Sequence, residues 1–156
     1  MKRKLTEKEI SVLKELYYDE IDYSKVVITN EHLFSKILKK FSGIVFDNTI
    51  VFTRTGYKDD FTTCISDITL LIHEMCHVWQ FQNLKYRWYK AGIEHIKYAG
   101  STYGYQITDH KRIIDFRFEQ QGEIMADYYR LRQNNSPKVQ MYEDVIYSII
   151  KRKKPV

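Results

Sequence analysis

The stretch LLIHEMCHVWQFQ, residues 70–82, decides the fold that we predict for this chain. His73 and His77 are four residues apart, and Glu74 directly follows the first of them. Residues four apart on a helix lie on the same face, so both imidazoles can reach one ion about 2.0–2.1 Å away. Zn²⁺ accepts imidazole and carboxylate ligands, and a neighbouring Glu can take a proton from metal-bound water. The pattern therefore predicts a helix over residues 66–84 that carries a catalytic zinc site.

The residues on both sides of this motif are apolar, with ITLLI before it and VWQF after it. Burying His, Glu and His in such a stretch without a partner would cost roughly several kcal/mol. The alternative interpretation, an ordinary helix with two solvent-facing histidines, fits this context less well. Ser66 is the expected N-cap of the helix, and Cys76 is expected to be a small buried side chain within it.

A third ligand is expected from a second helix, over residues 111–133. Glu119, Glu123 and Asp127 are spaced four apart there, so their carboxylates lie along one face. The rest of this helix is rich in apolar residues, and an inward acidic stripe on such a helix needs a cation. A solvated acidic face would have the same periodicity, so the spacing alone leaves both interpretations open.

The longer strings HEMCHVWQFQ and FEQQGEIMADYY resemble small bacterial zinc metallopeptidase-like proteins of the gluzincin type. Vgr-related proteins, some of them linked to type VI secretion loci, belong to the same resemblance, which covers roughly residues 66–132. It implies a Zn²⁺-dependent metallopeptidase, a hydrolase whose substrate is a peptide or protein. It also implies a zincin-like arrangement, in which the HExxH helix packs against a second ligand-bearing helix.

The resemblance also implies a role for each acidic residue of the second helix. In that family a Glu on the second helix is the third zinc ligand, and an Asp four residues later supports a ligand histidine. Carried over to this chain, Glu123 is the ligand and Asp127 supports His73. Glu119 is the rival ligand one turn earlier, and it lines the cleft or orients a neighbour if Glu123 binds zinc.

Other residues are candidates for the remaining roles of a catalytic site. His95 offers a different third ligand, as in SprT-like peptidases, but that alternative leaves the acidic stripe unexplained. Tyr103 and Tyr105, in a glycine-bracketed segment between the two ligand helices, are candidate catalytic residues that stabilise an oxyanion. A further alternative is a catalytically inactive zinc-binding adaptor module, although such a module has no use for the base Glu74.

Composition and periodicity predict an α+β fold, mostly helical with a small sheet, in a single domain over residues 1–156. Thr6 and Glu9 form a capping box at the start of the first helix. Two short β-branched runs around Asp47 and Asn48 predict a hairpin. The expected elements are helices over residues 6–17, 30–41, 66–84, 87–97, 111–133 and 138–151 and strands over 25–29 and in the hairpin 43–55.

The net charge of +5 comes from the two ends of the chain, which carry seven of the 25 basic residues. We therefore expect solvated basic termini rather than a nucleic-acid partner. No apolar run is long enough to cross a bilayer, and the N-terminus lacks the apolar region of a secretory signal. The expectation is a protein without a membrane partner, either cytoplasmic or exported without a cleavable signal peptide.

Overall fold

The structure is a computed structural model, and it describes residues 1–31, 43–85, 103–107 and 112–147. The helix expected over residues 87–97 and the candidate ligand His95 lie outside these ranges, and so does nearly all of the helix expected over 30–41. Within the described residues the chain has an α+β fold, with four α-helices and a small mixed sheet.

The sheet has four strands in the order β1-β2-β4-β3. The expected hairpin is confirmed, because β3 and β4 pair antiparallel and Asp47 turns the chain between them with φ 55°. β2 pairs with β4 in parallel, and β1 pairs with β2 antiparallel. The strands are β1 (Lys2–Arg3), β2 (Val27–Thr29), β3 (Gly43–Phe46) and β4 (Thr49–Phe52).

Arg3 departs from the expectation of a solvated basic N-terminus, whereas Lys2 and Lys4 are exposed as expected. Arg3 donates two hydrogen bonds, of 2.7 and 2.8 Å, to the carboxylate of Glu9, whose side chain is fully buried. Glu9 also accepts hydrogen bonds from the backbone of Thr6 and of Phe61. A charge is tolerated in the interior when it is paired and hydrogen-bonded in this way. The capping box predicted at Thr6 is present.

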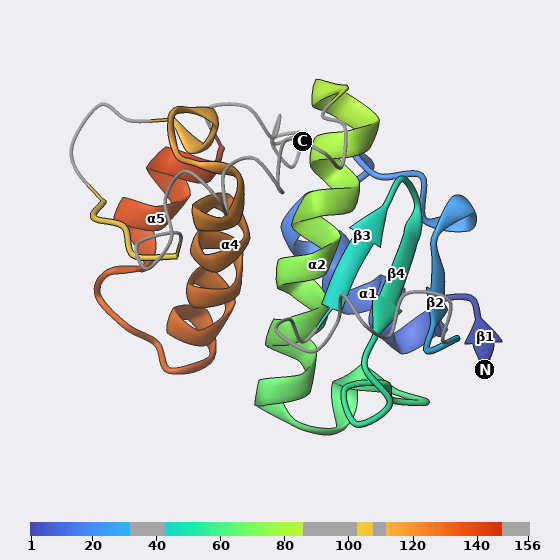
Figure 1. Cartoon of the computed structure of the whole chain (residues 1–156). Coiled ribbons are helices and arrows are strands. Elements are labelled where there is room, and N and C mark those ends of the chain that lie inside the picture. Colours follow the sequence, from blue (N-terminus) through green and yellow to red (C-terminus); the bar gives the residue numbers. More distant parts are fainter. Residues whose placement is uncertain (32–42, 86–102, 108–111, 148–156) are drawn as a thin grey trace.

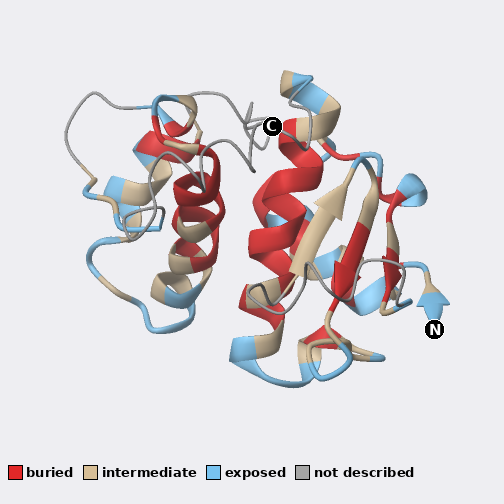
Figure 2. Ribbon diagram, in the orientation of Figure 1, coloured by how far each residue is buried: buried red, intermediate tan, exposed pale blue. Residues whose placement is uncertain are grey.

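Helix α2 (Ile65–Leu84) runs through the middle of the molecule, with the sheet on one side and α4 (Phe118–Gln133) and α5 (Val139–Ile146) on the other (Figure 1). Its central part is buried, and so is most of α4 (Figure 2). Helix α1 (Glu7–Tyr17) also contacts α2, and the hydroxyl of Tyr17 donates a 2.8 Å hydrogen bond to the carbonyl of Ile72.

Two helix starts differ from those predicted. Helix α2 begins at Ile65, so the N-cap is Cys64, two residues before the expected Ser66, and its side chain makes no cap hydrogen bond. The helix expected over 111–133 is interrupted, because Phe116 and Arg117 have extended backbone. The short 3-10 helices are η1 (Tyr23–Lys25), η4 (Phe61–Thr63) and, before this interruption, η5 (Ile113–Asp115). Among the described residues no helix is both long and apolar enough to cross a membrane.

Candidate metal centre

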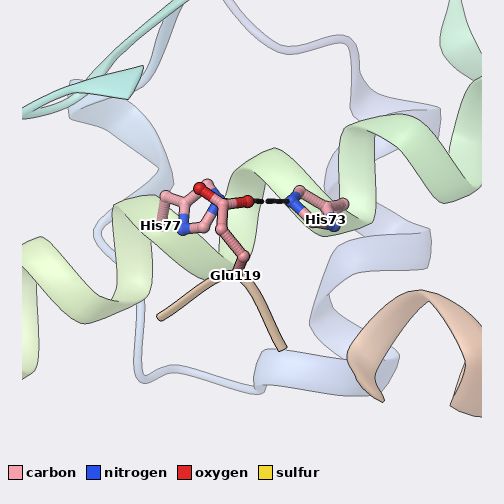
Figure 3. A group of neighbouring side chains, drawn as sticks. All are labelled: His73, His77 and Glu119. Carbon is pink, nitrogen blue, oxygen red and sulfur yellow. Dashed lines mark hydrogen bonds and ion pairs between the residues drawn. The ribbon is translucent and has the colours of Figure 1, made fainter. Parts of the chain in front are cut away.

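Helices α2 and α4 pack against each other and bring three side chains to one point. His73 and His77 come from α2, Glu119 comes from the first turn of α4, and all three are buried. Figure 3 shows the two imidazoles and the carboxylate turned toward one another. Glu119 Oε2 lies 3.1 Å from His73 Nε2 and 3.4 Å from His77 Nε2, and the two Nε2 atoms are 3.2 Å apart.

These separations match three corners of a zinc coordination tetrahedron. Tetrahedral ligands at 2.0–2.1 Å from Zn²⁺ are separated from one another by about 3.3 Å. The three measured separations fall on both sides of that value. The residue types, two neutral imidazoles and a carboxylate, are also those that zinc binds when a fourth position stays open.

Hydrogen bonds behind His77 determine which of its nitrogens carries a proton. Gln80 Nε2 donates to the carbonyl of Phe118 at 3.0 Å and to Gln121 Oε1 at 2.9 Å. The Gln80 amide is therefore oriented with Oε1 toward His77 Nδ1, 2.9 Å away. Because that oxygen only accepts, Nδ1 carries the proton, and the lone pair of His77 is on Nε2. Phe118 also stacks on the His77 ring at 4.3 Å.

Glu123 determines the tautomer of His73 in the same way. Its Oε1 lies 3.2 Å from His73 Nδ1, the nitrogen on the opposite side of the ring from Glu119. A carboxylate only accepts, so this contact places the proton on Nδ1 and leaves the lone pair on Nε2. With both histidines neutral, the lone pairs of both Nε2 atoms and Glu119 Oε2 point toward the same place. A proton or a cation between these three buried acceptors would be attracted by all of them.

A proton shared within the cluster would be held strongly when no cation is present. Burial lowers the pKa of His73, but hydrogen bonds to Glu119 and Glu123 outweigh that effect and raise it to about 10. For Glu119, burial by itself would raise the pKa. The charges of His77 and His73 and their hydrogen bonds outweigh burial and hold the pKa of Glu119 far below its usual range. Both shifts have the same cause, a strong attraction for positive charge at this point.

Glu119 and Glu123 lie on opposite sides of the His73 ring. The sequence interpretation made Glu123 the third ligand, but its carboxylate reaches Nδ1 of His73, which faces away from the three-atom cluster. Glu119 is at the shared point instead, because the start of α4 at Phe118 puts it in the helical turn nearest both histidines. Asp127, expected to support His73, instead accepts hydrogen bonds from Tyr105 and Arg130.

The candidate catalytic residues lie at different distances from the cluster. Glu74 is buried, and this burial raises its pKa. The Glu74 carboxylate packs closely against Gly43 in the edge strand β3, because a Cβ on Gly43 would lie 2.8 Å from it. The Tyr103 ring lies beside His73, with centroids 6.3 Å apart. Tyr105 does not join the cluster, because its hydroxyl contacts Asp127 and Tyr142.

Three supporting residues were not foreseen from the sequence. Gln80 lies three positions after His77, so helical spacing alone would have placed it beside that histidine. Gln121 and Gly122 had no such signal, because their neighbours come from the other helix. Gly122 lets α4 approach the histidine closely, since a Cβ there would be 2.8 Å from the His73 ring.

Comparison with known proteins identifies relatives in a secretion system. The type VI secretion system spike protein VgrG2b of Pseudomonas aeruginosa is 31% identical over 136 residues, which cover 81% of this chain. The matched part is 13% of the length of that spike protein. Among solved structures, the effector domain of Pseudomonas aeruginosa VgrG2b is similar with a TM-score of 0.71 and 28% identity, covering 91% of this chain and 80% of that one. No family model matches the chain.

These relatives correct the assignment made from the sequence. One is described as a type VI secretion system spike protein and the other as the effector domain of VgrG2b, and neither match nor any family model indicates a metallopeptidase family. The gluzincin metallopeptidase assignment and the expected hydrolysis of peptide bonds are therefore contradicted. What the comparisons do indicate is that this chain is similar to a type VI secretion effector domain.

Proposed function

We propose that this chain is an effector domain of a type VI secretion system and that it acts through a Zn²⁺ centre held by His73, His77 and Glu119. The effector role rests on the similarity to the VgrG2b effector domain, and it implies export together with a spike protein. The observation that carries the metal centre is the set of three buried acceptor atoms spaced 3.1–3.4 Å apart. The finer fold expectation, a zincin-like pairing of α2 with α4, is part of this proposal.

We further propose that the domain is an enzyme in which Glu74 is the general base. A zinc ion at the cluster would supply Lewis acidity and polarise the group that reacts. Glu74 follows the ligand His73 on α2, and its carboxylate takes up a proton during the reaction. Burial favours that step because it raises the pKa of Glu74 toward the neutral range in which a general base works well.

Metal analysis of purified protein tests the centre. We expect one zinc per chain in the wild type, loss of zinc in Glu119→Ala, and weakened but measurable binding in Glu123→Ala. Loss with Glu123→Ala and retention with Glu119→Ala would restore the ligand set expected from the sequence. Absence of zinc from the wild type after zinc is supplied would refute the metal centre.

Growth of bacteria that express the domain tests the enzymatic role. Wild type and Glu74→Gln are expressed both in the cytoplasm and with an added export signal. We expect growth inhibition by the wild type in at least one compartment and none by Glu74→Gln, while Glu74→Gln keeps its zinc. Equal inhibition by both proteins would show that the effector acts without this base, as a binding module would.

A further inference from the structure

A second feature lies next to the metal centre, on the far side of Glu123. It is an open pocket of about 670 Å³ between α4, the start of α5 and residues 103–107. Its exposed side chains include Tyr103 and Met141, which are 43% and 39% exposed. These are two of the four large hydrophobic side chains that are exposed in the described part of the chain. The pocket therefore has an apolar rim that a hydrophobic group can cover.

The polar groups of the pocket form a hydrogen-bonded chain with a defined direction. Asp127 accepts from the hydroxyl of Tyr105 through Oδ2 and from Arg130 Nη1 through Oδ1, the latter at 2.6 Å. Tyr105 uses its only proton in this bond, so it must accept in its 2.9 Å contact with the hydroxyl of Tyr142. Tyr142 is then the donor in that contact. The oxygen of Tyr142 is left with lone pairs and no proton to give to a ligand.

Most of the remaining polar groups in the pocket are acceptors as well. Glu123 contacts His73 through Oε1, which leaves Oε2 able to accept another hydrogen bond. The carboxylates of Glu123 and Asp127 are both in the lining. Lys138 is the single cationic side chain of the lining, and it is exposed at the N-cap of α5. Gln106 is also in the lining, and its amide can donate or accept. A ligand with donors would match Tyr142, Glu123 and Asp127, and an anionic ligand would meet the two carboxylates.

We propose that this pocket binds a cationic donor, an ammonium or guanidinium group, at the end of an apolar stem. The stem packs between Tyr103 and Met141, and the cation is held by Tyr142, Asp127 and Glu123. A lysine or arginine side chain of a target protein has this form, because its methylene stem is apolar and its charge is at the tip. The role of the pocket in placing a target beside zinc rests on the proposed function, whereas its binding of a cation does not need the metal.

Titration with three probes that share a butyl stem and differ in their polar end tests the chemistry of the pocket. n-Butylammonium, n-butanol and pentanoate are added separately to ¹⁵N-labelled protein, and amide shifts are followed by NMR. We expect n-butylammonium to bind most tightly and to shift amides of residues 103–107 and of α5, with n-butanol weaker and pentanoate weakest. Equal affinity for the three probes, or preference for pentanoate, would overturn the proposal.

Two matched hydroxyl deletions locate the binding. Tyr142→Phe removes the acceptor in the pocket, and we expect about tenfold weaker binding of n-butylammonium, in line with the loss of a hydrogen bond to a charged group. Tyr147→Phe is the control, because its hydroxyl contacts Tyr18 and Tyr128 instead and is not in the pocket lining. Equal effects of the two substitutions, or no effect of either, would contradict the assigned site.

A charge variant on the surface keeps the test valid if Tyr142→Phe fails to fold. Lys138→Gln removes the one cationic side chain of the pocket lining, while Arg130 stays paired with Asp127 from outside the lining, so n-butylammonium is expected to bind several-fold more tightly. Unchanged or weaker binding would refute the proposal.

Repeating the titration with zinc-loaded and zinc-free protein separates the pocket proposal from the metal-centre proposal. Zinc loading without n-butylammonium binding refutes the pocket alone, and n-butylammonium binding by a protein that takes up no zinc refutes the metal centre alone.

Discussion

Gln80 determines which nitrogen of His77 is free to bind a metal. Its amide donates to two acceptors on or near α4, so its oxygen is directed at His77 Nδ1. The Gln80 side chain thus fixes the ring orientation and the tautomer of His77, although Gln80 is not itself one of the three clustered residues. Groups of this kind, behind a metal ligand, contribute to affinity because they make the ligand more basic and limit its rotation.

Replacing Gln80 by Leu should weaken zinc binding by about 10–100-fold. The substitution removes the acceptor of the Nδ1 proton and keeps a similar volume in the core. Competition with a chelator of known affinity measures the change. Gln82→Leu is the control on the same helix, because Gln82 contacts Asp22 and Asn48 away from the site. Equal losses in both variants would show that the effect comes from α2 as a whole.

Gly122 is the second residue whose size matters. Gly122→Ala normally favours a helix by about 1 kcal/mol, but here the added Cβ would lie 2.8 Å from the His73 ring. We expect a lower zinc content and a lower melting temperature. Gly104→Ala serves as the control, since a Cβ there meets nothing within 4 Å. A Gly122→Ala protein with full zinc content and a raised melting temperature would show that α4 can move away at little cost.

At the scale of elements, the start of α4 decides which carboxylate reaches the histidines. Because Phe116 and Arg117 are extended, the helix begins at Phe118, and Glu119 falls in its first turn. The first turn of a helix carries partial positive charge, which favours a carboxylate there. Glu123 is one turn further along α4 and reaches the other side of the His73 ring.

Strand β1 ties the N-terminus to α1 through the pair of Arg3 and Glu9. Arg3→Ala should lower the free energy of unfolding by about 3 kcal/mol, because it leaves the buried carboxylate of Glu9 without its cation. Urea denaturation measures the loss, and Lys2→Ala, at an exposed position of the same strand, should cost far less. Equal losses would mean that strand pairing, and not the ion pair, stabilises this end.

At the scale of the whole molecule, the proposed metal would join the two sides of the fold. His73 and His77 belong to the helix beside the sheet, and Glu119 belongs to the helix pair on the other side (Figure 1). A ligand that binds only the folded state stabilises it, by about 4 kcal/mol at a thousand times its dissociation constant. Zinc is therefore expected to stabilise the packing of α2 against α4.

Adding zinc to chelator-treated protein should raise the melting temperature by on the order of 10 °C. Thermal unfolding followed by circular dichroism, with zinc and then with excess chelator, measures the shift. Glu119→Ala should show almost no shift, because its cluster has lost the carboxylate that neutralises the ion. An equal shift in Glu119→Ala would assign the stabilisation to zinc bound elsewhere.

The sequence by itself determined the features that depend on local periodicity. The capping box at Thr6, the hairpin around Asp47 and the helix that carries His73 and His77 each follow from side chains a few residues apart. Helical spacing also placed Glu119 and Glu123 on one face of a second helix. It could not choose between them, because residues four apart share a face and both are carboxylates.

Only the tertiary structure places the two carboxylates relative to the histidines, because their positions depend on how α4 lies against α2. The extended residues before Phe118 set the start of α4, and Gly122 permits the close approach that puts Glu119 at the Nε2 atoms and Glu123 at Nδ1. The pairing of β1 with β2 and the contacts of Asp127 with Tyr105 were likewise decided by residues distant in the chain. The physical reason is the same in each case. The periodicity of a sequence shows which side chains lie on one face of a helix or strand, but the contacts of that face depend on tertiary packing.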